Sequence, residues 1–282
     1  MRLVSWNIAK SRKAVDCLLQ MSVDVALLQE CHPDLLLAAS EKGALEFNPH
    51  PPIGAEHYDR WPMIVRLSDS IRVEWFRQTV PQYRVAQDEV SVSGIGVIEV
   101  ARLVPADGTR PFVAASIYAR WMKPHPSAGS KWRVGYQDGS AHAAITDLSA
   151  FIGHKNPANH RVLAAGDFNT IRGATENNAL ALPARDRTIF DRMDALGLQF
   201  LGPQHPNGRP ADPRPPGLPA ETGNVPTFHS THQSPRTAAN QLDYVFASRG
   251  FHEGIQVRAL NEVDEWGPSD HCRLLIELGS AR

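Results

Sequence analysis

Cysteine is scarce in this sequence, and its positions form no pattern. The 282 residues include three cysteines, and they are far apart, at Cys17, Cys31 and Cys272. An odd number of distant cysteines argues against a disulfide framework and against a cysteine-based zinc site. Reduced thiols are typical of the cytosol, so we expect a cytoplasmic protein.

Long hydrophobic runs are also missing. No apolar stretch reaches the roughly 20 residues that a transmembrane helix requires. The first ten residues, MRLVSWNIAK, hold too short an apolar run for a signal peptide. The sequence therefore predicts no membrane contact, and nothing in it indicates an obligate protein partner.

Neither sign of charge is in excess. Lysine and arginine together number 29, aspartate and glutamate number 30, and the formal net charge is −1. Bulk charge therefore does not mark a nucleic-acid-binding protein. A local basic patch can still steer a polyanion to one face of the molecule.

The sequence does contain many short apolar, β-prone runs separated by turn signals. Strands are expected over residues 3–8, 23–30, 63–67, 71–76, 94–103, 112–120, 161–167, 241–247, 254–260 and 271–278. Helices are expected over 14–21, 33–39, 141–152 and 185–196, and residues 202–226, with eight prolines, should form an irregular loop. Many strands with few inserted helices favour two sheets packed face to face, with helices on the outer faces.

The motif GDFN at residues 166–169 places an aspartate and an asparagine directly after a buried strand. Gly, Asp and Asn are turn formers, so a turn is the simplest interpretation of this motif alone. Several other apolar strands also begin or end at a polar side chain, however, and together the set comprises Asn7, Glu30, Tyr118, Asp167, Asn169, Asp243, Asp270 and His271. Because sites tend to be built on loops of a rigid scaffold, this recurrence predicts a polar cleft along one edge of the sandwich.

Three of these side chains suit a metal ion. Carboxylates and carboxamides without thiolates favour a hard cation, Mg²⁺ or Mn²⁺. Glu30 and Asp270 are the best anionic ligands, and Asn7 is a neutral ligand beside them. Such a cation neutralises phosphate charge and polarises the phosphoryl group, so the ligand types indicate phosphoester chemistry.

The other polar side chains suit roles around a phosphate. Asp167 can take a proton from an attacking water while Asn169 fixes its geometry. Asp243 can orient His271, which then holds a proton near a phosphate oxygen. Tyr118 can donate a hydrogen bond to such an oxygen.

In their order along the chain, the motifs SWNI, LLQE, IYAR, GDFN, LDYVFAS and SDH resemble those of the endonuclease/exonuclease/phosphatase superfamily. The resemblance extends from about residue 2 to residue 278. It implies an α/β fold with a single domain over 1–282, built as a four-layer α/β sandwich of two packed, mainly antiparallel sheets flanked by helices. It also implies divalent-metal-dependent hydrolysis of a phosphoester, with Glu30 as the main metal carboxylate, Asn7 as its neighbour and Asp270 as a second metal-site or water-organising carboxylate.

The same resemblance assigns roles to the remaining motif residues. Asp167 resembles the water-activating aspartate of the superfamily, and Asn169 resembles its companion on the phosphate. His271 resembles the phosphate-binding histidine, with Asp243 as its paired aspartate. Tyr118 resembles the tyrosine of abasic-site endonucleases, whereas deoxyribonuclease I-like members tend to have histidine at that position.

A basic and aromatic segment follows Tyr118 directly. Cations for phosphates and rings for bases are the components of a nucleic-acid groove, and this segment supplies Arg120, Trp121, Lys131, Trp132 and Arg133. The alternative is a surface loop whose tryptophans pack on the body of the protein. Its position beside the cleft slightly favours the binding interpretation. The proline-rich loop and the segment at 57–62 can also rim the cleft.

These observations favour a metal-dependent phosphodiesterase, and we expect a DNA or RNA endonuclease or exonuclease. Two alternatives stay open. The first is a phosphatase or phosphodiesterase acting on a small-molecule or lipid phosphoester, because fold does not determine substrate. The second is a catalytically silent binding protein on the same scaffold, although the intact set of site residues argues against it.

Overall fold

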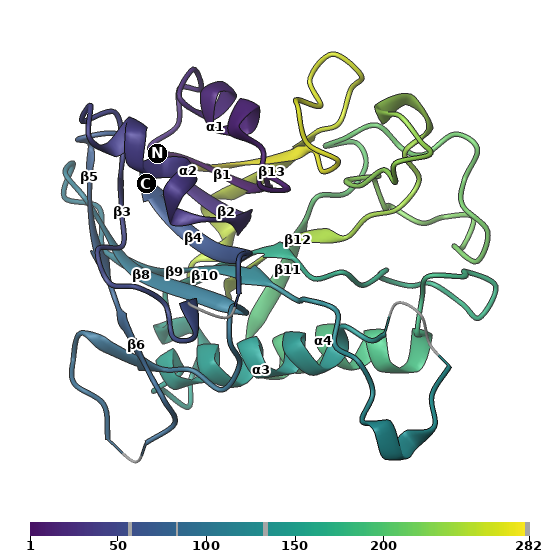
Figure 1. The fold of residues 1–282 in the computed structure, drawn as a ribbon, viewed down its shortest axis with the longest axis horizontal. Coiled ribbons are helices and arrows are strands. Elements are labelled where there is room, and N and C mark those ends of the chain that lie inside the picture. The colour runs from purple at the N-terminus through teal and green to yellow at the C-terminus, as the bar shows by residue number, and fades with distance from the viewer. Residues whose placement is uncertain (56–57, 83, 132–134, 280–282) are drawn as a thin grey trace.

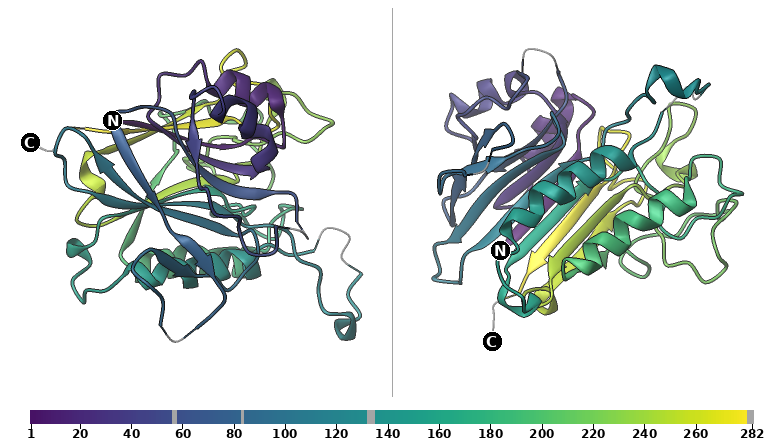
Figure 2. Two further views of the ribbon diagram at one scale, coloured as in Figure 1. Left: turned by 60° about the vertical axis from the view of Figure 1, so that its left-hand side comes forward. Right: turned by 90° about the horizontal axis from the view of Figure 1, so that it is seen from below.

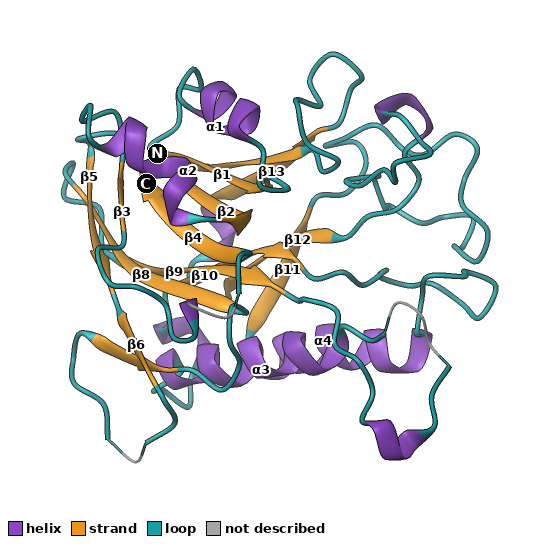
Figure 3. Ribbon diagram, viewed as in Figure 1, coloured by secondary structure: helices purple, strands orange, loops and turns teal. Residues whose placement is uncertain are grey.

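The computed structural model describes residues 1–55, 58–82, 84–131 and 135–279. Its ribbon shows four layers: helices, a β-sheet, a second β-sheet and a further pair of helices (Figure 1). Long loops gather beyond one end of the two sheets, as the colouring by secondary structure makes clear (Figure 3). This is the four-layer α/β sandwich that the sequence motifs predicted.

The first sheet contains six strands and carries both ends of the described chain. Their order is β13 (Ile255–Leu260), β14 (Arg273–Leu278), β1 (Arg2–Asn7), β2 (Val25–Cys31), β4 (Trp61–Arg66) and β3 (Glu46–Phe47). Only β1 and β2 pair in parallel, and the other neighbours are antiparallel. The parallel pairing places the carboxyl ends of β1 and β2 side by side.

The second sheet repeats this plan. Its order is β11 (Leu198–Gly202), β12 (Asp243–Ser248), β10 (Val162–Asp167), β9 (Phe112–Tyr118), β8 (Ile98–Pro105) and β5 (Ile71–Trp75). Here β9 and β10 are the parallel pair, and their carboxyl ends also lie side by side. A small separate sheet pairs β6 (Arg77–Thr79) with β7 (Glu89–Ser91).

Helices cover the outer face of each sheet. Helices α1 (Arg12–Leu18) and α2 (Pro33–Ser40) pack on the first sheet, and α3 (Asp138–Leu148) and α4 (Pro183–Ala195) pack on the second. Figure 2 shows α3 and α4 side by side across the second sheet. Apolar side chains between the two sheets, including Leu27, Ile64, Leu103, Leu163 and Leu274, form the central core, and their burial is the main favourable contribution to folding.

Every strand and helix expected from the sequence is present, with ends that shift by a few residues. The first helix begins two residues earlier than expected because Ser11 caps it, with Ala14 N donating to Ser11 Oγ at 3.3 Å. Residues 203–226 contain no strand or helix, as the prolines indicated. The sequence did not indicate β3, β6, β7 or β11, which have two to five residues each.

A glycine allows β9 and β10 to come together directly beside the strand end at Asp167. Gly166 has a φ of +153°, and a Cβ atom at this position would lie 1.9 Å from the carbonyl oxygen of Ile117 on β9. The clash would involve backbone atoms, which cannot turn away as a side chain can. Glycine is therefore required at this point of the motif.

We predict that Gly166→Ala destabilises the protein strongly, because β9 and β10 must separate to make room for the methyl group. The expected loss in the free energy of unfolding is on the order of 3 kcal/mol, measured by urea denaturation. Gly153→Ala is the matched control, because a Cβ there would meet open space. Equal stability of the two variants would contradict this account of Gly166.

Candidate active site

The polar side chains that the sequence singled out lie where the carboxyl ends of the two parallel strand pairs meet. Asn7 ends β1 and Glu30 lies in the last two residues of β2, while Tyr118 ends β9 and Asp167 ends β10. The first pair belongs to one sheet and the second pair to the other. The long loops in green and yellow rise beyond this edge (Figure 1).

A hydrogen bond joins the two sheets at the centre of this edge. Asn7 Nδ2 donates to Asp167 Oδ2 at 2.9 Å, and both side chains are almost fully buried. The backbone N–H of Ala9 donates to Asn7 Oδ1 at 3.0 Å. This second bond fixes which end of the Asn7 amide faces the carboxylate.

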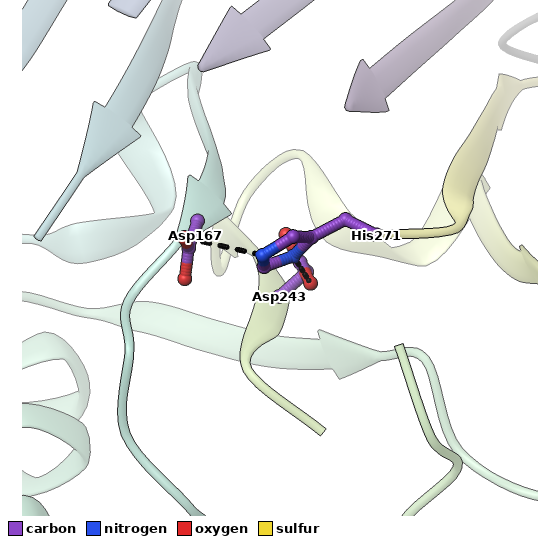
Figure 4. Close-up of side chains that lie close together, drawn as sticks. All are labelled: Asp167, Asp243 and His271. Carbon is purple, nitrogen blue, oxygen red and sulfur yellow. Dashed lines mark hydrogen bonds and ion pairs between the residues drawn. The ribbon is translucent and has the colours of Figure 1, made fainter. Parts of the chain in front are cut away.

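His271 connects the two sheets a second time. It precedes β14 of the first sheet, and its Nδ1 lies 2.8 Å from Oδ2 of Asp243, the first residue of β12 in the second sheet. Its Nε2 points toward Asp167, at 3.8 Å from Oδ2 (Figure 4). The ring of Phe228 packs against the imidazole with the two centroids 4.9 Å apart.

The two carboxylates determine the charge of His271. Burial alone would lower the pKa of this imidazole, but Asp243 and Asp167 outweigh it and raise the pKa from the ordinary 6.5 to about 10. Burial raises the pKa of Asp167 from 3.8 to about 7, although the charge of His271 opposes this shift. The short contact with Asp243 and the direction of these shifts favour a protonated His271 next to Asp167.

Glu30 makes a third contact between the sheets. The hydroxyl of Tyr118 donates to Glu30 Oε1 at 2.9 Å, and Arg60 Nη1 donates to Glu30 Oε2 at 2.9 Å. Burial and the nearby carboxylates of Glu30 and Asp167 raise the pKa of the Tyr118 hydroxyl, so this group is a hydrogen-bond donor at neutral pH. The sequence predicts that Tyr118 donates to a phosphate oxygen, whereas in this structure it donates to Glu30.

Arg60 is the site residue with the weakest signal in the sequence. It lies just before β4, outside every motif, in a segment expected only to rim the cleft. Its contact with Glu30 depends on the antiparallel pairing of β2 with β4, which places the start of β4 next to the end of β2. No spacing along the chain reveals that pairing.

Asp270 reaches the same edge through its neighbour Ser269. Ser269 Oγ lies 2.7 Å from the carbonyl oxygen of Asn7 and 3.3 Å from Asp270 Oδ1. The indole of Trp6 donates to the carbonyl oxygen of His271 at 3.0 Å. These contacts hold the segment before β14 against the end of β1.

Two groups of side chains can be compared as metal ligands. Potential ligand atoms of Asp167, Asp243 and His271 lie within 4.8 Å of one another, which is close enough for one ion to contact all three. Two of those residues are already joined by the bond between Asp243 and His271, and the raised pKa of His271 favours a proton on the imidazole instead of a metal.

The second group, Glu30, Asp270 and Asn7, offers only oxygen atoms when Asn7 binds through Oδ1. This donor set fits a hard divalent cation. Glu30 is 15% exposed at its side chain, so an ion has access to it from solvent. The second group is therefore the better candidate for a metal, and the first is the better candidate for holding a proton.

Asn169 lies against Asp167 and contacts the segment after β9. Its backbone N–H donates to Asp167 Oδ1 at 2.8 Å, and its Nδ2 donates to Asp167 Oδ2 at 3.1 Å. The φ of Asn169 is +49°, a left-handed conformation that asparagine tolerates better than most residues. The indole N–H of Trp121 donates to Asn169 Oδ1 at 3.0 Å.

The residues expected to bind nucleic acid have different environments in the structure. The guanidinium of Arg120 lies 4.7 Å from the centre of the Tyr58 ring, and Lys131 is exposed. Trp121 is half-buried against Asn169. Trp132 and Arg133 lie outside the described residues.

A family model matches this chain over residues 4–271, and its description is the endonuclease/exonuclease/phosphatase family. No curated protein sequence is a significant match. The structure is also similar to the AP endonuclease LMAP from Leishmania major, with a TM-score of 0.63, 17% identity, and coverage of 99% of this chain and 88% of that one.

Two further similar structures come from Neisseria. The 3'-5' exonuclease NExo from Neisseria meningitidis has a TM-score of 0.62, 16% identity, and coverage of 99% of this chain and 100% of the other. The 3' phosphatase NExo from Neisseria, bound to product DNA hairpin, has a TM-score of 0.58, 15% identity and the same coverage. At these identities the likeness concerns the fold.

None of the helices in the described ranges is both long and apolar enough to cross a bilayer.

We predict that replacing Asp243 by asparagine lowers the pKa of His271, because the imidazolium loses its bonded anion. In the metal-free wild type, the imidazole should titrate near pH 10 in an NMR titration. In Asp243→Asn the titration should move down by about one pH unit or more. Asp191→Asn, an exposed aspartate on α4, is the matched control and should leave the titration in place.

The raised pKa of His271 also affects the stability of the folded protein. Because the pKa of folded His271 lies above its ordinary value, its stabilising effect is complete below pH 6.5 and is lost as pH rises through about 10. If the His271 imidazole titrates near its ordinary pKa in the wild type, the pair of Asp243 and His271 does not stabilise a proton on the ring.

Proposed function

Because the chain belongs to the endonuclease/exonuclease/phosphatase family, we propose that it hydrolyses phosphodiester bonds with a divalent metal ion, and that its substrate is nucleic acid. The observation that carries this proposal is the buried chain of Asp243, His271, Asp167 and Asn7, which draws on both sheets. Such an arrangement places a proton acceptor, the Asp167 carboxylate, 3.8 Å from a charged imidazole, that of His271.

Asp167 is the proposed proton acceptor. Burial raises the pKa of the Asp167 carboxyl above its ordinary value, toward the pH range in which a general base is most effective. Asn7 and Asn169 both donate to this carboxylate and fix its plane. The attacking water would therefore meet a carboxylate held in one orientation.

His271 is the proposed electrostatic partner of the phosphate. Its imidazolium would offset the charge that builds on a nonbridging oxygen as the bond to phosphorus forms. Asp243 holds the ring in place through Nδ1 and leaves Nε2 directed toward Asp167.

The proposed metal ligands are Glu30, Asp270 and Asn7, with Mg²⁺ or Mn²⁺ as the ion. A bound ion of this kind neutralises phosphate charge and polarises the phosphoryl group. Tyr118 and Arg60 hold the Glu30 carboxylate at the edge, one through each oxygen. Ser269 holds the Asp270 segment against Asn7.

Charge beside the site supports nucleic acid as the substrate. Arg60 contacts Glu30 directly, and Arg120 follows Tyr118 by two residues and stacks on Tyr58. Lys131 lies exposed on the same connecting segment. Cations placed along a cleft bind a phosphate backbone, and two of the similar structures are named as an AP endonuclease and as a phosphatase bound to a DNA hairpin.

We predict hydrolysis that requires Mg²⁺ or Mn²⁺ and stops in EDTA. The test is a panel with plasmid DNA, an abasic-site duplex, single-stranded RNA, inositol phosphates and a chromogenic phosphodiester, each with Mg²⁺ and with EDTA. Glu30→Gln should lower kcat on the best substrate by on the order of 100-fold or more, because one anionic ligand becomes neutral. Its melting temperature should stay close to that of the wild type.

Glu41→Gln is the matched control, since Glu41 is exposed at the end of α2, and it should keep wild-type turnover. Full turnover in EDTA would contradict the metal requirement. Turnover of inositol phosphates without cleavage of any nucleic acid would contradict the substrate, and no turnover on any substrate would contradict the proposed function.

A further inference from the structure

We propose that Trp121 is a positioning residue. Trp121 fixes the orientation of the Asn169 amide and is not primarily a platform for stacking a base. This inference rests on the proposed function, because Asn169 acts on the carboxylate that the reaction would use. The sequence groups Trp121 with the residues expected to bind nucleic acid. Its contact in the structure is with the catalytic edge itself.

The amide of Asn169 has three partners. Trp121 Nε1 donates to Oδ1 at 3.0 Å, while Nδ2 donates to the carbonyl oxygen of Ala119 at 3.1 Å and to Asp167 Oδ2 at 3.1 Å. Each end of the amide therefore has a partner of the matching kind. Asn169 is 9% exposed, so little water is available to replace a lost partner.

The chemistry of the indole makes this arrangement directional. An indole N–H can only donate, so it can bond the oxygen of the amide and never its nitrogen. Binding the oxygen directs the NH₂ group of Asn169 toward Ala119 and Asp167. In the opposite orientation, the amide oxygen would face a carboxylate oxygen, and neither could donate to the other while Asp167 is ionised.

The backbone on both sides of Trp121 is held in place. The carbonyl oxygen of Arg120 accepts from Ser140 Oγ, at the start of α3, at 2.6 Å. Met122 and Tyr136 exchange two backbone hydrogen bonds, of 2.7 and 2.9 Å. A residue anchored at both neighbours can impose an orientation on its partner, which a side chain on a free loop cannot do.

Glycine at 135 permits this anchoring. Gly135 has a φ of +103°, and a Cβ there would lie 2.3 Å from the carbonyl oxygen of Met122. The close approach holds Met122, the residue after Trp121, against Gly135 and Tyr136, just before α3. The Trp121 indole is therefore part of a series of hydrogen bonds that extends from Ser140 of α3 to Asp167.

Positioning and stacking predict different kinetics, and Trp121→Phe separates them. Phenylalanine keeps an aromatic ring for stacking but has no N–H. If Trp121 positions Asn169, kcat should fall by about tenfold on nucleic acid and on a chromogenic phosphodiester alike, with little change in KM on either. Trp75→Phe is the matched control, because Trp75 also loses one indole hydrogen bond, to the carbonyl oxygen of Ile64, on the edge strand β5.

Unchanged kcat for Trp121→Phe on both substrates would overturn the inference. If Trp121→Ala then also shows wild-type kcat with a raised KM on nucleic acid alone, the role of Trp121 is stacking. Absence of activity in the wild type would instead contradict the proposed function.

A measurement that does not depend on turnover separates failure of this inference from failure of the proposed function. In an ¹⁵N NMR spectrum, the indole N–H of Trp121 is identified by its loss in Trp121→Phe, and its exchange with deuterium reports its hydrogen bond. Exchange should be about tenfold or more slower in the wild type than in Asn169→Ala. Equal exchange rates in the two proteins would overturn the inference whether or not the enzyme is active.

Discussion

The hydrogen bond from Asn7 to Asp167 joins the ends of two strands that belong to different sheets. The rest of the site depends on that closeness. Glu30 meets Tyr118, and His271 meets Asp243, across the same boundary. Each of the three contacts takes one partner from each sheet, so the packing of the sandwich sets the geometry of the site.

Polar contacts continue beneath this edge and support it. Gln29 Nε2 donates to Ser116 Oγ at 2.9 Å, and Ser116 Oγ donates to the carbonyl oxygen of Leu28 at 2.7 Å. All three groups are buried between the sheets. Buried hydrogen bonds are directional and specify one arrangement more sharply than apolar packing alone, and this layer separates the apolar core from the charged edge.

Much of this edge could be predicted from the sequence because it consists of strand ends. Asn7, Asp167 and Asp243 lie at the limits of apolar runs, and the runs themselves predict the strands. The four-layer fold followed from the resemblance of the motifs to the superfamily. The partner of each residue was harder to infer, since contacts such as Asn7 with Asp167 depend on how two sheets pack.

The residues that the sequence did not reveal are those whose roles depend on pairing or on a single contact. Arg60 reaches Glu30 only through the pairing of β2 with β4. Trp121 reads as part of a basic and aromatic segment, and only the structure shows its bond to Asn169, 48 residues away. The short strands β3 and β11 were also missed, because edge strands of a few residues form through pairing with longer neighbours and carry little periodicity of their own.

The most direct test of this account is the turnover number of Asp167→Asn with Mg²⁺ on the best phosphodiester substrate. Asparagine keeps the size of the side chain and removes the carboxylate on which Asn7, Asn169 and His271 converge. If this carboxylate accepts the proton of the attacking water, kcat should fall by on the order of 10²–10⁴-fold, with an unchanged circular dichroism spectrum. A folded Asp167→Asn variant with kcat within about twofold of the wild type would contradict the account, because general-base catalysis contributes far more than that.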